Sequence, residues 1–173
     1  VFAGFLMVEK FGYSVKDIAS LYMLNHLFNW AFAGRIGALV GRIGERHALT
    51  FEYCGLIGVF TAYAFVTDGD WAAALYVIDN LFFSLALAIK TYFQKIADPA
   101  DIASTAGVAF TINHIAAVVI PALFGLVWLV SPAAVFLMGA AMALVSLVLA
   151  RNIPLHPSPG NEVVFGKVRF AEA

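Results

Sequence analysis

The chain has 173 residues, of which 62% are hydrophobic and 12% are charged, and its formal net charge at pH 7 is −1. Soluble domains carry about 25% charged residues, and a soluble domain of this length cannot bury so much apolar surface, so the composition predicts a polytopic membrane protein. The near-neutral charge offers no basic patch for nucleic acid, and a single cysteine, Cys54, excludes a disulfide framework.

The N-terminal residues predict the end of a membrane helix rather than a complete one. Residues 1–8 are apolar and begin without Met, which indicates a fragment whose preceding segment is missing. Residues 9–16 form a polar connection. Ser14 and Asp17, three residues apart, resemble a helix-capping box, so we expect the first full membrane span over residues 16–40.

A short polar turn rich in glycine and arginine separates two long apolar runs, over residues 16–40 and 48–66. Each run is long enough to cross a bilayer, which takes about 20 residues. Two spans joined by so short a turn predict an antiparallel hairpin with a polar tip over residues 41–47. The turn has the pattern Gly37-x-x-x-Gly41-Arg42-x-Gly44-x-Arg46.

This pattern resembles the signature loop G-x-x-x-D-R-x-G-R-R of the major facilitator superfamily, a family of membrane transporters. Gly41 stands where the family has Asp, and Glu45 stands where it has the first of the two final basic residues. The family repeats the loop in degenerate form between helices eight and nine, so the resemblance implies the C-terminal six-helix half of such a transporter. Glu52, one turn into the following helix, is a candidate to supply the lost carboxylate.

Three further spans complete the expected all-α bundle of about five full spans plus the end of another. They are predicted over residues 71–95, 99–130 and 132–150. Asp98-Pro99 has the sequence of a helix start, with Asp98 as the cap and Pro99 at the first helical position, and Pro121 predicts a kink. Ser131-Pro132 predicts the last helix start. We expect residues 152–173, which contain three prolines, to form a loosely ordered tail.

Lysine and arginine are distributed unequally between the two predicted sides of the membrane. One side has only Lys10 and Lys16, and the other has Arg42, Arg46, Lys90, Lys95, Arg151, Lys167 and Arg169. The positive-inside rule therefore predicts that the glycine-arginine turn and the tail are cytoplasmic.

Polar residues inside membrane spans are costly and mark functional sites. They are concentrated in the spans over 16–40, 71–95 and 99–130, which the resemblance equates with helices eight, ten and eleven, lining the central cavity of the family. The candidate residues for substrate contact are Asn25, Asn29, Arg35, Tyr76, Asp79 and Asn113. The candidate carriers of a coupling proton are Asp79, His26 and His114.

The resemblance implies a secondary transporter that moves a small solute by alternating access, with a proton as the coupling ion and the missing N-terminal half as its partner. Two alternatives remain open, a membrane-embedded enzyme and a non-transporting receptor or assembly subunit. The enzyme is disfavoured because no metal-ligand spacing and no nucleophile–base arrangement is visible. We expect no cofactor and no metal. The asparagines also fit a purely structural role, as hydrogen-bonding contacts between helices.

Overall fold

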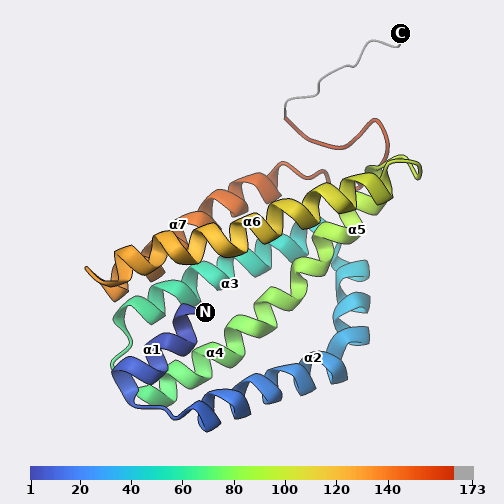
Figure 1. The fold of residues 1–173 in the computed structure, drawn as a ribbon. Helices are drawn as coiled ribbons and strands as arrows, with labels where there is room; N and C mark the ends of the chain where they lie inside the picture. Colours follow the sequence, from blue (N-terminus) through green and yellow to red (C-terminus); the bar gives the residue numbers. More distant parts are fainter. Residues whose placement is uncertain (166–173) are drawn as a thin grey trace.

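The computed structural model describes residues 1–165, and within them the chain is an all-α bundle, which confirms the predicted fold class (Figure 1). The elements are α1 (Phe2–Phe11), α2 (Val15–Ile43), α3 (Glu45–Phe65), α4 (Gly69–Phe83), the 3₁₀ segment η1 (Ser84–Ala86), α5 (Leu87–Ile96), α6 (Ile102–Trp128) and α7 (Pro132–Arg151). Lys167 and Arg169, which contribute to the predicted orientation, lie outside the described residues.

Four helices in the described part of the chain are long and apolar enough to cross a membrane. They are α3, the joined α4, η1 and α5 over Gly69–Ile96, α6 and α7. The chain is therefore a multi-pass membrane protein. α2 is longer than α3 but is not among the four. The span over residues 16–40 stays a prediction.

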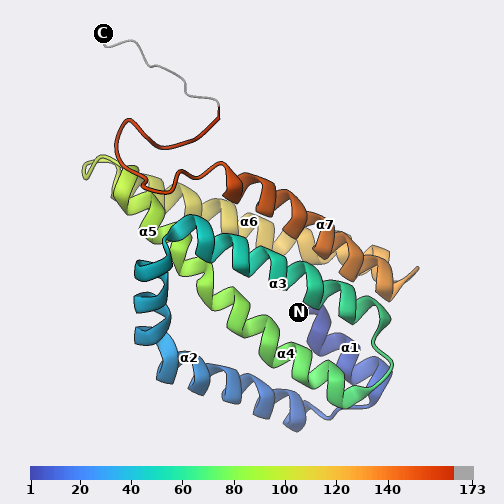
Figure 2. The ribbon, with the colours of Figure 1, turned by 180° about the vertical axis from the view of Figure 1, so that it is seen from behind.

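α3 is the central helix of the bundle. It packs along α7 more extensively than against any other element, and next against α4. The two views in Figures 1 and 2 show α2 at the edge of the bundle, where it bends partway and its second half rises towards the start of α3. α2 packs no more extensively against α3 than against α4, so the predicted antiparallel hairpin of α2 and α3 is wrong.

The connection between α2 and α3 is a single residue, because both helices extend into the predicted tip over residues 41–47. Gly44 has φ 79° and ψ 156°, a backbone conformation that glycine adopts without the steric cost of a Cβ atom. Its amide donates to the Val40 carbonyl oxygen over 2.9 Å. Gly44 therefore turns the chain from α2 into α3 within one residue, where a longer loop was expected.

Two of the three predicted helix starts are confirmed. Ser14 and Asp17 form a complete capping box at the start of α2. Ser131 caps α7, with its side chain accepting from the Ala134 amide, and Pro132 follows at the first helical position. The Asp98-Pro99 start is wrong.

Asp98 and Pro99 lie in the turn that precedes α6. The Asp98 carboxylate accepts a hydrogen bond from the Ala100 amide over 2.9 Å, which is a turn within the loop and not a helix cap. α6 begins at Ile102 and stays helical through Pro121 to Trp128. The local side-chain hydrogen bond of Asp98 competes with helix formation here.

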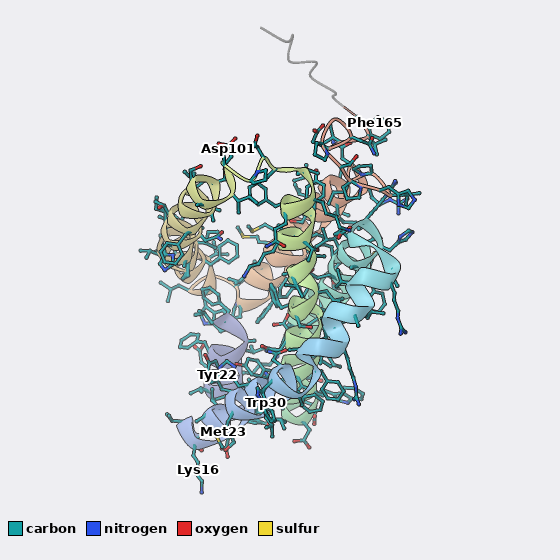
Figure 3. The ribbon with its side chains drawn as sticks, turned by 90° about the vertical axis from the view of Figure 1, so that its right-hand side faces the viewer. Lys16, Tyr22, Met23, Trp30, Asp101 and Phe165 are labelled. Carbon is teal, nitrogen blue, oxygen red and sulfur yellow. The ribbon has the colours of Figure 1, made fainter. Side chains whose placement is uncertain are left out.

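The loops gather at two opposite ends of the bundle. One end, which we call the Asp68 end, contains residues 12–14, 66–68 and 129–131, and the other, the Gly44 end, contains Gly44, the 97–101 loop and the segment after α7. Side-chain hydrogen bonds join the Asp68 end: Lys10 Nζ to the Val66 carbonyl, Tyr13 to the Gly69 carbonyl, and Trp128 Nε1 to the Glu9 carboxylate. Figure 3 shows Lys16 at one extreme of the molecule and Asp101 and Phe165 at the other.

Each end has its own apolar core. Near the Asp68 end, α1, α3, α4, α6 and α7 contribute Leu6, Met7, Val59, Tyr63, Ala72, Trp128, Val135 and Phe136. Near the Gly44 end, the core contains Val40, Ala48, Leu49, Leu85, Ala88, Ala150 and Ile153. The stretches of α3 and α4 between these two cores form a middle layer of the bundle.

The segment after α7, residues 152–165, contacts the helices at a few positions, and its loosely ordered character stays a prediction. Asn152 hydrogen-bonds to both the amide and the carbonyl of Phe165, and Ile153 is buried. The Tyr92 hydroxyl of α5 donates to the Glu162 carbonyl oxygen over 2.5 Å. Prolines limit the conformations of an irregular segment, and they favour such fixed turns as well as loose tails.

Candidate functional site

Asp79 lies in the middle layer of the bundle and has no hydrogen-bond partner at one of its carboxylate oxygens. Its Oδ1 is buried, and no donor among residues 1–165 reaches it. The side chain lines a cavity of about 250 Å³ between α1, α3, α4, α6 and α7, where the other walls include Phe60, Phe83, Pro121 and Phe136. A carboxylate in an otherwise apolar cavity must be protonated, hydrated or paired with a bound group.

A second cavity brings together two asparagines from different helices. Asn29 of α2 and Asn80 of α4 line a cavity of about 290 Å³, with Ser84 of η1 beside them. The Asn80 amide nitrogen donates to the Tyr76 carbonyl oxygen over 3.0 Å. Asn80 was not among the predicted site residues, although it is next to Asp79 in the sequence. Asn80 follows the predicted residue Tyr76 by one helical turn, and this spacing was the signal that could have found it.

Asp79 and Asn80 therefore face different cavities. Tyr76 and Asp79 of α4 were predicted to contact the substrate together with the asparagines of α2. In the structure it is Asn80 that shares a cavity with Asn29, and Asp79 shares its cavity with α1, α6 and α7. Adjacent residues on a helix point about 100° apart, so the two polar residues serve different helix interfaces.

Asn25 is the most deeply buried of the predicted residues on α2. Only 3% of it is exposed, and its amide nitrogen has no hydrogen-bond partner within the described part of the chain. An unsatisfied amide in an apolar interior costs about 1–3 kcal/mol. Asn25 therefore keeps an unused hydrogen-bond donor in the interior, at a cost in the stability of the folded chain.

Of the remaining predicted residues, Tyr76 of α4 is partly buried against the apolar core near the Asp68 end. Asn113, His114, His26 and Arg35 lie on exposed faces and are not brought together. Asn113 is exposed on α6, and His114 beside it contacts the Phe110 carbonyl of its own helix through Nδ1 at 2.9 Å. His26 is exposed on α2 and packs edge-on against Tyr22, with 4.2 Å between the ring centroids. Figure 3 shows Tyr22 on α2, at the part of the molecule away from Asp101.

Arg35 lies on an exposed face of α2, with its guanidinium carbon 5.4 Å from the centroid of the Phe32 ring. It forms no ion pair within residues 1–165. A cation over an aromatic face gains a modest electrostatic stabilisation. This contact is local to α2, so the structure does not connect Arg35 with the other candidate residues.

The signature-loop residues occupy the Gly44 end. Gly37 and Gly41 lie within α2, and a Cβ atom at Gly37 would only touch Leu87 at 3.9 Å, while one at Gly41 would meet open space. Arg42 is exposed and Arg46 is partly buried, and neither forms an ion pair in the described residues. Of these residues, only Gly44 has a conformation that requires glycine.

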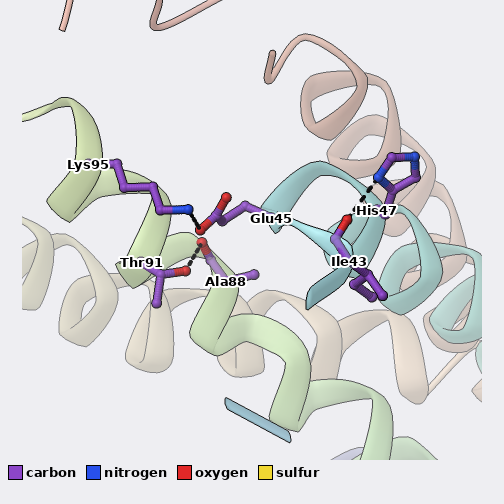
Figure 4. Close-up of polar contacts among 6 residues, drawn as sticks. All are labelled: Ile43, Glu45, His47, Ala88, Thr91 and Lys95. Carbon is purple, nitrogen blue, oxygen red and sulfur yellow. Dashed lines mark hydrogen bonds and ion pairs between the residues drawn. The ribbon is translucent and has the colours of Figure 1, made fainter. Parts of the chain in front are cut away.

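The ion pair at this end is made by Glu45, which sequence reasoning treated only as a departure from the family pattern. Lys95 Nζ of α5 lies 2.6 Å from Glu45 Oε1, and the Glu45 side chain is 2% exposed (Figure 4). Glu45 is the first residue of α3, where the helix dipole favours a negative charge, and Lys95 lies in the last turn of α5, where it favours a positive one. The opposite charges of these two helix ends were the signal that could have found the pair.

Glu52, the predicted substitute for the missing loop carboxylate, makes no ion pair. Its side chain is 2% exposed, and its Oε2 has no hydrogen-bond partner among the described residues. The ion pair at this end is made by Glu45 and not by Glu52. The reason is the one-residue connection at Gly44, which brings the first residue of α3 next to the end of α5.

The helix that contains Asp79 and Asn80 is interrupted directly after them. η1 replaces α-helical geometry over Ser84–Ala86, and Ser84 Oγ donates to the Leu81 carbonyl oxygen over 2.6 Å. A 3₁₀ stretch within a long helix is a common position for a hinge. No group of three or more potential metal ligands occurs in residues 1–165.

Comparison with known proteins gives one distant similarity. The chain is 24% identical over 143 residues to an uncharacterized MFS-type transporter of Methanocaldococcus jannaschii. The alignment covers 82% of this chain and 36% of the relative, so the chain spans about a third of the length of that protein. No protein-family model matches the chain, and no solved structure matches it.

Proposed function

We propose that the chain is the C-terminal half of a secondary transporter of the major facilitator type, which moves a small solute across the membrane by alternating access. Two independent lines support this. The glycine-arginine loop over residues 37–46 resembles the family signature, and the distant relative carries the family name over an alignment of 143 residues.

The observation that carries the proposal furthest is the pair of partly buried polar residues on α4. Asp79 and Asn80 lie side by side in a membrane-spanning helix and line two cavities. Placing polar side chains at such depth costs free energy, so they mark positions that contact a solute or an ion. In the proposed transporter, Asn29 and Asn80 contact the solute, and Asp79 carries the coupling proton.

The exposed polar positions fit a partner that completes the cavity. Asn113 and His114 on α6 and His26 on α2 point away from the described helices. α6 packs mainly against α7, and much of its apolar surface is exposed, including Val108, Phe110, Ile112 and Ile115. In the proposal, the N-terminal half covers part of this surface and lipid covers the rest.

Solute uptake by the full-length protein in proteoliposomes tests the proposal. A panel of labelled small solutes is offered with an imposed proton gradient, and at least one is expected to accumulate in a protein-dependent way. Loss of accumulation when the gradient is collapsed would support the proton as the coupling ion. Failure of every solute class, with folded protein in the membrane, would favour a receptor or assembly subunit.

Single substitutions then locate the site. Asn29→Ala and Asn80→Ala are expected to raise the KM for the transported solute by about tenfold, the cost of one hydrogen bond of about 1.4 kcal/mol. Thr61→Ala is the matched control, because Thr61 is exposed on α3 and its hydroxyl donates only to the Ile57 carbonyl of its own helix. An equal effect of all three variants would remove Asn29 and Asn80 from the site.

A further inference from the structure

Glu52 is a carboxylic acid enclosed in the interior of α3. It lies two turns after the start of the helix, and 2% of it is exposed. Its neighbours one turn away on the same face are Ala48, Leu49 and Leu56, all buried and apolar. One carboxylate oxygen, Oε2, has no hydrogen-bond partner among residues 1–165.

Phe82 of α4 packs against α3 at residues that precede and follow Glu52. Its ring packs against Phe51, with 5.4 Å between centroids. It also fills the space above Gly55, where an added Cβ atom would lie well inside van der Waals contact with the ring. Phe51 precedes Glu52 directly and Gly55 follows it by one turn, so this contact shields the stretch of α3 that holds Glu52 from solvent.

No charged group of the neighbouring elements compensates Glu52. α3 packs against α7, α4, α5, η1 and α2, and η1 carries no titratable residue. The titratable groups on the others within this part of the bundle are Arg151 of α7, Tyr76 and Asp79 of α4, Lys90, Tyr92 and Lys95 of α5, and Arg35 and Arg42 of α2. On α3 itself they are Glu45, Arg46, His47, Tyr53 and Cys54.

None of the cations at the Gly44 end pairs with Glu52. Arg46 lies six residues before it, about 120° away around α3, and forms no ion pair in the described residues. Lys95 is bound to Glu45, and Arg151, Lys90 and Arg42 are exposed. No cation lies within 4.0 Å of Glu52 in residues 1–165. An ionised carboxylate in this position is therefore uncompensated.

Glu45 provides the contrast on the same helix. It is equally buried, at 2% exposure, and lies two turns earlier, yet it has the Lys95 ammonium at 2.6 Å. A buried carboxylate with a paired cation retains its charge, whereas one without a partner binds a proton to become neutral. The same helix therefore presents an ionised and a neutral carboxyl group seven residues apart.

We propose that Glu52 is a proton-binding site, occupied in this conformation because the packing of α3 encloses the side chain without a cation. On binding, a hydronium ion gives its proton to the carboxylate, the carboxyl O–H bond forms, and a neutral acid and a water molecule are left. This site is additional to the coupling carboxylate proposed at Asp79, and its occupancy rests on the enclosure of Glu52 alone. Any role of the site in transport rests on the proposed function.

Infrared spectroscopy of the full-length protein at neutral pH, without solute or gradient, tests the occupancy. A protonated carboxylic acid has a carbonyl stretch well separated from that of a carboxylate. Glu52→Gln, made in an Asp79→Asn background, is expected to remove a protonated-acid band. Glu45→Gln in the same background is the matched control and is expected to leave that band and to reduce the carboxylate signal. A band that persists in Glu52→Gln overturns the proposal.

The pH dependence of thermal unfolding gives a second readout. In the proposal Glu52 is neutral in the folded state, whereas an exposed glutamate of the unfolded chain ionises at about pH 4.3. A group that is protonated only in the folded state makes the melting temperature fall as the pH rises above that value. Glu52→Gln mimics the neutral acid, so it is expected to keep the wild-type melting temperature in mild acid and to flatten the fall towards alkaline pH. A Glu52→Gln variant that fails to fold, or melts lower at every pH, indicates an ionised and paired Glu52 and overturns the proposal. Neither measurement depends on transport, so a failed uptake assay leaves both results interpretable.

Discussion

Lys95 Nζ lies 2.6 Å from Glu45 Oε1 and thereby joins the last turn of α5 to the first residue of α3. Glu45 is buried whereas half of the Lys95 side chain is exposed. Next to the pair, Thr91 Oγ1 donates to the Ala88 carbonyl oxygen over 3.1 Å, and His47 Nδ1 lies 3.0 Å from the Ile43 carbonyl oxygen (Figure 4). This ion pair holds α3 and α5 together at the Gly44 end of the bundle.

Removing the cation of this pair is expected to destabilise the protein. Lys95→Met leaves the buried Glu45 carboxylate without a partner, which costs about 1–3 kcal/mol once the exposure of Lys95 is taken into account. The melting temperature of the purified full-length protein measures the loss. The double variant Glu45→Gln/Lys95→Met is expected to regain most of it, because no unpaired charge remains. A double variant that is as unstable as the sum of both single variants would refute the coupling.

The close approach of α3 and α4 at Gly55 gives a second stability prediction. An alanine Cβ atom at this position would overlap three atoms of the Phe82 ring. Gly55→Ala is therefore expected to lower the free energy of unfolding by about 1–3 kcal/mol, because ring or backbone must shift. Phe82→Leu in the same background is expected to restore part of the melting temperature.

Gly58 is the matched control for Gly55, since it is on the same helix and an added Cβ atom meets nothing within 4 Å. Gly58→Ala is expected to be neutral or to stabilise the helix by up to about 1 kcal/mol, the difference in helix propensity. Equal destabilisation by both substitutions would show that the contact with Phe82 does not govern packing.

Cysteine labelling tests the predicted orientation. Thr67 at the Asp68 end and Ala100 at the Gly44 end are both exposed. In a Cys54→Ser background, an impermeant thiol reagent added to intact cells is expected to label Thr67→Cys and to spare Ala100→Cys until the membrane is opened. The reverse pattern would place the glycine-arginine turn outside.

Asp79→Asn separates proton coupling from a structural role. The substitution keeps size and hydrogen bonding but removes titration, so solute exchange is expected to survive while gradient-driven accumulation is lost. Its unfolding temperature is expected to match that of the wild type, because no partner of Asp79 Oδ1 is present in residues 1–165 to be stranded. Accumulation at the wild-type level would exclude Asp79 as the coupling carboxylate. A large fall in melting temperature would instead indicate a cation supplied from outside this part of the chain.

Local features of the fold were predictable from the sequence alone. The composition predicted a membrane protein, because a chain with so much apolar surface is stable only where lipid covers that surface. The Ser14–Asp17 capping box and the Ser131-Pro132 start were predicted correctly, since both depend on hydrogen bonds within four residues. The start at Asp98 was predicted wrongly for the same local reason, because its side chain also satisfies a turn.

Only the tertiary structure decided which polar residues meet. The sequence grouped Asp79 with the asparagines of α2 as substrate contacts, but in the structure Asn29 shares a cavity with Asn80, and Asp79 lines the cavity shared with α1, α6 and α7. Helical periodicity gives the angle between residues on one helix, whereas the rotation of that helix depends on all its neighbours. The pairing of Glu45 with Lys95, and the lack of a partner at Glu52, follow from the same packing, because a single residue at Gly44 sets where α3 begins.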